Sequence, residues 1–132
     1  MFVDYHIHPN FSIDGTDSVD AFCRRALKIG LDEICFTTHY DIDPARKEID
    51  GLVRVNGKLV SFDSNWFDHY FKDLKKARAT YTKMGLEVKF GIEVDDQREL
   101  EDEIRRNLSG QSFDFVLGAV HCLDHASLTI PK

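Results

Sequence analysis

The chain has 132 residues, 42% of them hydrophobic and 30% charged, which fits one globular domain with a modest core and requires no second domain. Its formal net charge of -6 at pH 7 argues against a nucleic-acid-binding surface, because recognition of a phosphate backbone depends on clustered Lys and Arg. The N-terminus shows no basic segment followed by an apolar one, and no apolar run of about 18 residues can span a bilayer, so we expect a soluble, cytoplasmic protein.

The first predicted element is a strand over residues 2–8 that ends in two histidines one residue apart. Side chains alternate between the two faces of a strand. We therefore expect His6 and His8 to point one way, and Tyr5 and Ile7 the other. Two imidazoles on one face are suited to hold a metal ion, although such a pair is common by itself.

A loop rich in turn-forming residues follows over residues 9–17. Within it Asp14 precedes a glycine, where an aspartate is first of all a turn former. One of the polar residues 16–18 can cap the next element, an amphipathic helix predicted over residues 19–29 from the spacing of its apolar side chains. Gly30 supplies the stop signal for this helix.

A short, apolar and β-prone segment predicts a buried strand over residues 33–37, and His39 follows just past its end. Standing alone, His39 fits equally well as a residue that closes the strand by a hydrogen bond to a carbonyl. Residues 42–64 lie outside the repeating pattern. Within them, the pair Asn56-Gly57 between two β-prone runs predicts a hairpin.

A long helix is predicted to begin after its cap, Asp63 or Ser64, to carry an apolar stripe from Phe67 to Tyr81, and to end at Gly85. The next strand covers residues 87–95 and carries Glu93 close to its end. A carboxylate at that depth is unusual. Two interpretations are open for Glu93: it is the buried partner of an arginine, or it is a metal ligand beside imidazoles.

A charged helix is predicted over residues 97–108, and a fourth strand over residues 113–120 brings His121 to its end. His69 lies on the long helix, away from the strand ends, and is not assigned to a site. The orientation of His125 is left open by its spacing from His121.

The three cysteines, Cys23, Cys35 and Cys122, are odd in number and widely separated along the chain. This pattern indicates reduced thiols rather than a disulfide framework. Cys122 is a minor alternative as a metal ligand, because it follows His121 directly.

The alternation of strands and helices predicts an α/β fold with a parallel sheet and right-handed crossovers. Four successive strands end in candidate ligands, at the end of the sheet where α/β barrels place their active sites. The candidates are His6, His8, His39, Glu93 and His121. A carboxylate among imidazoles suits Zn, Mn or Fe and can bridge two ions, so the sequence predicts a metal centre.

These segments resemble the four motifs of the polymerase-and-histidinol-phosphatase (PHP) superfamily, in order, and particularly its histidinol-phosphatase branch. The matching segments are Asp4-Tyr5-His6-Ile7-His8 with Ser12 and Asp14, then Thr38-His39, Gly91-Ile92-Glu93 and Gly118-Ala119-Val120-His121. The resemblance implies a distorted (β/α)7 TIM-like barrel. Residues 1–132 would form the N-terminal half of that single domain, with four parallel strands and their crossover helices.

The resemblance also implies two or three divalent ions, Zn, Mn or Fe, that hydrolyse a small phosphomonoester, most simply histidinol phosphate in histidine biosynthesis. The implied ligands are His6, His8 and Glu93 for the first ion, Glu93 and His121 for the second, and Asp14 and His39 for the third. Asp14 and His39 would also be the catalytic residues, with Asp14, or a water that it orients, protonating the leaving alkoxide.

The chain also departs from the family, whose members are longer and carry a further histidine and a late Asp-x-His pair that cannot be placed in this sequence. Four parallel strands moreover leave an exposed sheet edge. We therefore expect either a fragment that is impaired alone or a homo-oligomer paired through that edge. The alternative functions are a related phosphoesterase or exonuclease acting on nucleotides, which the acidic balance disfavours, and a non-catalytic metal-binding or assembly module.

Overall fold

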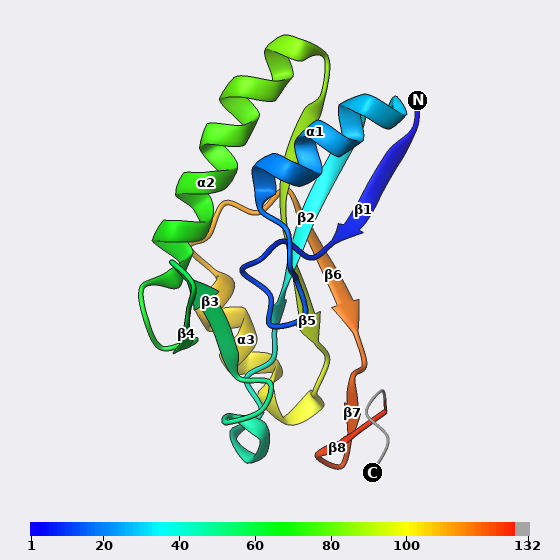
Figure 1. Cartoon of the computed structure of the whole chain (residues 1–132). Helices are drawn as coiled ribbons and strands as arrows, with labels where there is room; N and C mark the ends of the chain where they lie inside the picture. The colour runs from blue at the N-terminus through cyan, green and yellow to red at the C-terminus, as the bar shows by residue number, and fades with distance from the viewer. Residues whose placement is uncertain (129–132) are drawn as a thin grey trace.

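The computed structural model describes residues 1–128 and is built on a four-stranded parallel sheet in the order β1-β2-β5-β6 (Figure 1). The strands are β1 (Val3–Ile7), β2 (Glu33–Tyr40), β5 (Glu87–Asp95) and β6 (Phe115–Ala119). The sheet curls into one half of a barrel wall, and its four strands all run toward the lower end of the molecule in Figure 1. The predicted α/β class with four parallel strands is confirmed.

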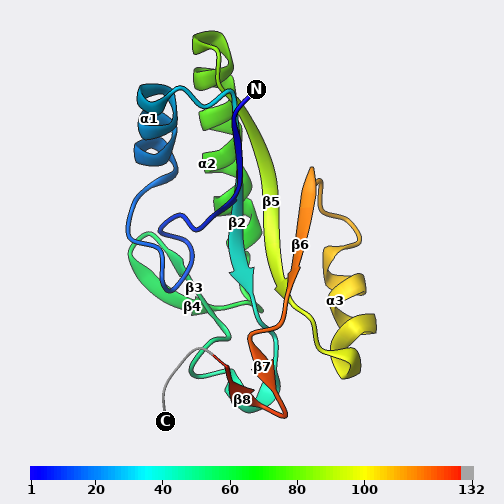
Figure 2. The same cartoon turned by 90° about the vertical axis from the view of Figure 1, so that its right-hand side faces the viewer.

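Three α-helices connect these strands: α1 (Val19–Ile29), α2 (Trp66–Tyr81) and α3 (Glu101–Leu108). α1 and α2 lie side by side on one face of the sheet (Figure 2). The side chain of Ser18 accepts a hydrogen bond from the main-chain N–H of Ala21, and Gly30 ends α1 with φ of 80°. Both signals were predicted, because a hydroxyl cap and a left-handed glycine satisfy the free backbone groups at helix ends.

Two predicted helix starts were wrong. Neither Asp63 nor Ser64 caps α2; its N-cap is Asn65, which makes no side-chain capping bond, whereas Asp63 pairs with Lys47 at 2.9 Å. The packing of Trp66, which is fully buried, anchors the first turn of α2 instead. α3 begins later than predicted, because a 3-10 turn, η3 (Arg98–Leu100), precedes it.

The hydrophobic core lies between the sheet and the helices. The outward-facing side chains of β2 and β5 meet the inner stripes of α1 and α2. The fully buried members of this core are Cys23, Ile34, Phe36, Val53, Trp66, Tyr70, Leu74, Leu86, Val88 and Ile92. This packing leaves the opposite face of β2 and β5, on which the candidate ligands of these strands lie, free for polar chemistry.

Two hairpins and two further 3-10 turns complete the described elements, and one of these turns, η2 (Thr82–Met84), directly follows α2. The predicted hairpin is confirmed as β3 (Leu52–Val55) and β4 (Lys58–Ser61), with Asn56 and Gly57 at φ of 51° and 79°. The turn η1 (Pro44–Arg46) precedes it. A second hairpin, β7 (Cys122–Leu123) with β8 (Ala126–Ser127), was not predicted, because two-residue strands are too short to show a period. Among residues 1–128, no helix is both long and apolar enough to cross a membrane.

Candidate metal centre

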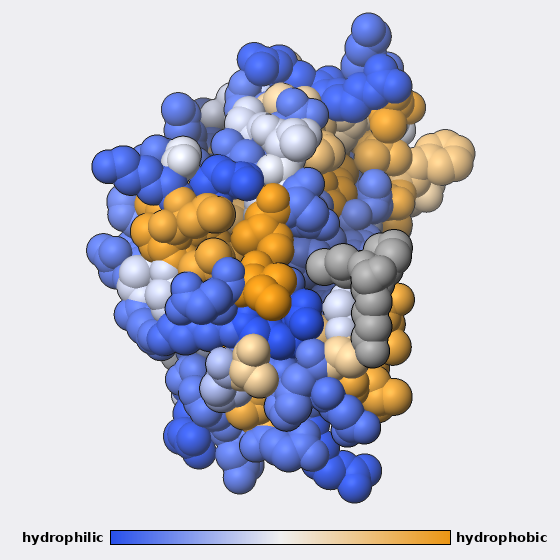
Figure 3. Space-filling view, turned by 60° about the horizontal axis from the view of Figure 1, so that its bottom comes forward, coloured by the Kyte–Doolittle hydropathy of each residue, from blue (hydrophilic) through white to orange (hydrophobic). Residues whose placement is uncertain are grey.

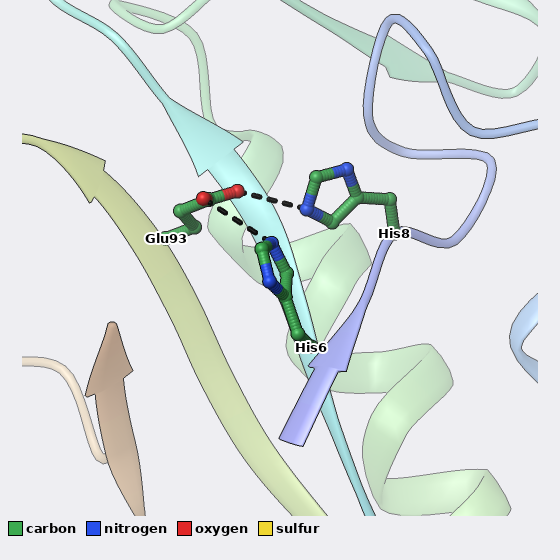
Figure 4. Close-up of side chains that lie close together, drawn as sticks. All are labelled: His6, His8 and Glu93. Atoms are coloured by element: carbon green, nitrogen blue, oxygen red, sulfur yellow. Dashed lines mark ion pairs between the residues drawn. The ribbon is translucent and has the colours of Figure 1, made fainter. Parts of the chain in front are cut away.

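Glu93 lies at the centre of a cluster of four imidazoles. Its side chain is 2% exposed, and the nearest nitrogen is His8 Nε2, 2.8 Å from Glu93 Oε2. His6 Nε2 and His39 Nδ1 each lie 3.2 Å from a carboxylate oxygen, and His121 Nε2 lies 3.3 Å away. Figure 4 shows the rings of His6 and His8 turned toward Glu93. Within the described residues, the ion-pair partners of Glu93 are therefore histidines and not an arginine.

Strand pairing brings two of these residues together. In the register of β2 with β5, His39 stands directly opposite Glu93. β2 runs to Tyr40 rather than ending at residue 37, so His39 lies within the strand and not just past its end. Parallel neighbours on the same face are close enough to interact, which fixes this pair without help from a loop.

An irregularity in β1 changes the face on which Tyr5 lies, while His6 and His8 share a face as the alternation of side chains predicts. The pairing advances from Asp4 to Ile7 on β1 while β2 advances only from Ile34 to Phe36, which leaves one extra residue on β1. Ile7 packs into the core, as predicted. Tyr5 was predicted to lie on the same face as Ile7, but it lies on the other face. Because of the extra residue, its hydroxyl donates a hydrogen bond to Glu33, on the face of β2 that carries His39.

The loop between β1 and α1 carries Asp14 to the cluster. Asp14 Oδ2 lies 2.9 Å from His8 Nδ1 and 3.4 Å from His39 Nε2, so both rings stand between Asp14 and Glu93. Ser12, in the same loop, accepts a hydrogen bond of 3.0 Å from the main-chain N–H of His39.

Arg54, on β3, holds this loop from outside the sheet. Its guanidinium donates to four main-chain carbonyls at 3.0 or 3.1 Å, those of Asn10, Ser12, Ile13 and Gly15. A planar guanidinium can satisfy several acceptors at once. The β3–β4 hairpin, which is not part of the alternation of parallel strands and helices, therefore positions the loop that carries Asp14.

All six residues predicted as metal ligands come together. Together with Asp41, which was not predicted, they form three overlapping groups: His6, His8 and Glu93, then His8, Asp14 and His39, and finally His39, Asp41 and His121. The other two histidines and Cys122 are not part of these groups, and His69 was not expected to be. His69 borders a separate small cavity beside Arg54, His125 pairs with Asp43 at 2.8 Å, and the Cys122 thiol is buried, which raises its pKa.

Sequence reasoning missed two carboxylates, Asp41 and Asp95, that contact His121. Asp41 Oδ1 lies 3.4 Å from His121 Nδ1, and Asp95 Oδ1 accepts a hydrogen bond from the main-chain N–H of His121. The sequence does contain a signal that indicates these two aspartates. Each stands two residues after a predicted ligand, Asp41 after His39 and Asp95 after Glu93, and residues two apart on a strand share a face.

The charged groups of the centre shift one another's pKa values. Burial opposes ionisation of Glu93, but the close ion pair with His8 and the charges of the imidazoles hold its pKa at about 2. Asp14 also has a lowered pKa, because the imidazoles outweigh its burial. The bond to Asp41 raises the pKa of His121 to about 9. The carboxylates of Glu93 and Asp14 are thus ionised at neutral pH, and their negative charge favours the binding of cations between the imidazoles.

The donor set fits a divalent metal ion. Within the described residues, Glu93 Oε2, His8 Nε2 and His39 Nδ1 are buried and make no well-aligned hydrogen bond, although all three lie close together. Buried polar atoms normally have a partner, and three such atoms facing one another are suited to share a cation. Figure 3 brings the lower end of the molecule forward and shows a mainly polar face with apolar patches.

A curled parallel sheet with imidazoles and carboxylates at the carboxyl ends of its strands defines an α/β protein of the barrel class with a site suited to divalent ions. The model of the PHP domain matches residues 4–130. The chain belongs to the PHP domain family.

Several known proteins are similar to the chain. It is 29% identical over 119 residues to the histidinol-phosphatase of Lactococcus lactis, covering 90% of this chain and 39% of that protein. It is 30% identical over 129 residues to a probable histidinol-phosphatase of Clostridium acetobutylicum, covering 97% and 42%. It also superposes with a TM-score of 0.74 and 26% identity on the crystal structure of the Lactococcus lactis histidinol phosphate phosphatase complexed with zinc, L-histidinol and phosphate.

That structural match covers 94% of this chain and 41% of the solved chain. The chain therefore spans about two fifths of the length of the relatives that it matches. This match, together with the four-stranded parallel sheet, establishes an α/β half-barrel fold.

Proposed function

We propose that this chain belongs to a metal-dependent phosphomonoester hydrolase whose substrate is histidinol phosphate. The observation that carries the proposal is the Glu93 carboxylate, buried among four imidazole nitrogens within 3.3 Å. The names of the relatives support the activity, and the zinc, L-histidinol and phosphate bound in the solved relative support the substrate.

Six side chains would hold two or three divalent ions, zinc by analogy with the solved relative, with manganese or iron as alternatives. They are His6, His8, Asp14, His39, Glu93 and His121. When bound, such ions neutralise phosphate oxygens and supply hydroxide near neutral pH.

The three cysteines are buried and free, which supports reduced thiols and a cytoplasmic location as part of the same proposal.

Asp14 and His39 are the proposed catalytic residues. The Asp14 side chain is 52% exposed, and Oδ2 faces both His8 Nδ1 and His39 Nε2. Because its pKa is lowered, this carboxylate is ionised at neutral pH. A water oriented by Asp14, rather than its own carboxyl, is therefore the better donor of the proton that the leaving alkoxide takes up.

We further propose that residues 1–132 form the N-terminal half of one barrel domain. β1 and β6 are the two edges of the sheet, and the apolar side chains Phe2, Val3 and Val116 are exposed along them. Exposed edges of this kind favour pairing with further strands. Those strands belong either to a longer chain or to a second copy of this half, and a mass measurement in solution distinguishes the two.

The first experiment measures bound zinc in Glu93→Gln, which removes the charge and keeps the shape. We expect zinc content to fall clearly below that of the unmodified chain, because the shared carboxylate is lost. Glu87→Gln is the matched control, since Glu87 lies exposed on the same strand. Unchanged zinc content in Glu93→Gln would refute the assignment of Glu93 and its neighbouring histidines as a metal site.

The second experiment measures phosphate release by a version of the protein extended past Lys132. We expect histidinol phosphate to be hydrolysed far faster than p-nitrophenyl phosphate, because a specific site contacts more than the phosphate. Equal rates point to a broad phosphoesterase instead. Zinc binding without phosphate release from either ester points to a metal-binding module.

A further inference from the structure

His121 is held from two sides by carboxylates that are absent from the predicted ligand set. Asp41 Oδ1 lies 3.4 Å from the ring nitrogen Nδ1, and Asp95 Oδ1 accepts a hydrogen bond of 2.6 Å from the main-chain N–H. Asp41 and Asp95 are 8% and 3% exposed. The other ring nitrogen, Nε2, lies 3.3 Å from Glu93 Oε1. The imidazole of His121 thus has a buried carboxylate at each nitrogen.

We propose that Asp41 is a positioning residue that fixes the orientation and tautomer of His121, with the proton on Nδ1 and the lone pair of Nε2 directed toward Glu93. A metal-binding histidine uses one nitrogen, and a carboxylate on the other nitrogen decides which one carries the proton. The proposal rests on the metal centre proposed above. In it, Asp41 acts through His121 and is not itself a ligand.

His121, like His8, lies outside the strands, and neighbouring side chains hold both its backbone and its ring. It lies between the end of β6 at Ala119 and the start of β7 at Cys122, so no strand fixes its side chain. Asp95 restrains the backbone at this point, and its second oxygen accepts a hydrogen bond from Gln97 Nε2 at 2.8 Å. Asp41 Oδ1, at 3.4 Å, lies closer to His121 Nδ1 than Asp95 Oδ1 does, at 3.8 Å, and Asp41 is therefore the group better placed to restrain the rotation of the ring.

A neighbouring pair provides a matched control. Asp43 Oδ2 lies 2.8 Å from His125 Nδ1, so it makes the same kind of contact two residues further along the segment that follows β2. The His125 side chain is 64% exposed and lies outside the cluster. Asp43 also accepts a hydrogen bond from the main-chain N–H of Ala45. Asp43→Asn can keep that bond through its side-chain oxygen while it removes the charge.

The test compares Asp41→Ala, Asp41→Asn and Asp43→Asn in the 132-residue chain. Nitrogen-15 NMR of His121 in the metal-free protein reports its tautomer at alkaline pH, above the pKa of about 9 that the Asp41 bond gives the ring. Competition with a chelator reports the affinity for Zn²⁺. We expect Asp41→Ala to lose the single tautomer and to bind Zn²⁺ about 10- to 100-fold more weakly. Asp41→Asn keeps a neutral acceptor, so its tautomer population and its Zn²⁺ affinity should be intermediate. Asp43→Asn should have the same tautomer and the same Zn²⁺ affinity as the unmodified chain.

An unchanged tautomer in Asp41→Ala overturns the proposal. Loss of one whole zinc ion with the tautomer retained overturns it too, because Asp41 is then a ligand. If the unmodified chain binds no zinc, the proposed metal centre fails, yet the NMR signal still decides whether Asp41 orients His121. Should Asp41→Ala not fold, Asp41→Asn decides, and unmodified values for both its tautomer and its zinc affinity refute the positioning role.

Discussion

Gly91 lets β2 and β5 approach closely enough for His39 and Glu93 to face each other. A Cβ added at Gly91 would lie 2.6 Å from Cys35 Sγ and 2.7 Å from the carbonyl oxygen of Phe36. Real Cβ atoms do not come so close to backbone, so the two strands would have to move apart. The absence of a side chain at this position is therefore part of the geometry of the site, two residues before its central carboxylate.

Gly91→Ala should accordingly destabilise the fold by about 1–3 kcal/mol, the usual cost of overpacking a core. Unfolding in urea measures the loss. Gly118→Ala on β6 is the matched control, because no atom lies within 4 Å of its added Cβ. Equal unfolding free energies for the two variants would contradict the argument.

At the scale of elements, three strands are joined at the end opposite the metal centre by Glu33 of β2. Its carboxylate accepts a hydrogen bond from the Tyr5 hydroxyl on β1 and pairs with Lys89 Nζ on β5 at 3.1 Å. The bond from Tyr5 and the pairing with Lys89 lower the pKa of Glu33. The same bond raises the pKa of Tyr5 to about 12.

This link makes part of the stability depend on pH. A carboxyl whose pKa is lowered on folding stabilises the folded state above its unfolded value, here 4.5, and loses that contribution as the pH falls through its folded value. Glu33→Gln should thus cost about 1 kcal/mol at neutral pH, and the difference should shrink in acid. Urea unfolding of both proteins at neutral and acidic pH checks this, and a difference independent of pH would speak against it.

The elements were predictable where local pattern decides them. Each main strand and the capped ends of α1 follow from spacing and turn chemistry, and the ligands stand near strand ends, so residues distant in sequence were expected to meet. Features set by long-range contacts were not predictable. The four carbonyls that Arg54 holds lie 39 to 44 residues away, and the extra residue in β1 shows only in its pairing with β2. The start of α2 depends on the burial of Trp66 and not on its cap.

At the scale of the whole molecule, the residues of the proposed metal centre come from all four strands of the sheet or from the segments that follow them. His6 belongs to β1, His39 to β2 and Glu93 to β5, while His121 follows β6. Unfolding separates these residues, so an ion bound by them binds the folded state almost exclusively. We therefore expect a metal ion bound at the proposed centre to stabilise the association of the four strands, in addition to its proposed catalytic role.

Removal of the metal should lower the thermal stability of the chain. At free zinc of 100 times Kd, binding contributes about 2.7 kcal/mol, which corresponds to a Tm difference of roughly 10 °C for a domain of this size. Thermal unfolding with zinc and with excess chelator measures that difference. Glu93→Gln should unfold at nearly the same temperature in both conditions, because it lacks the shared carboxylate. If the chelator shifts the Tm of both proteins equally, zinc acts elsewhere on the molecule and the four strands are not joined through Glu93.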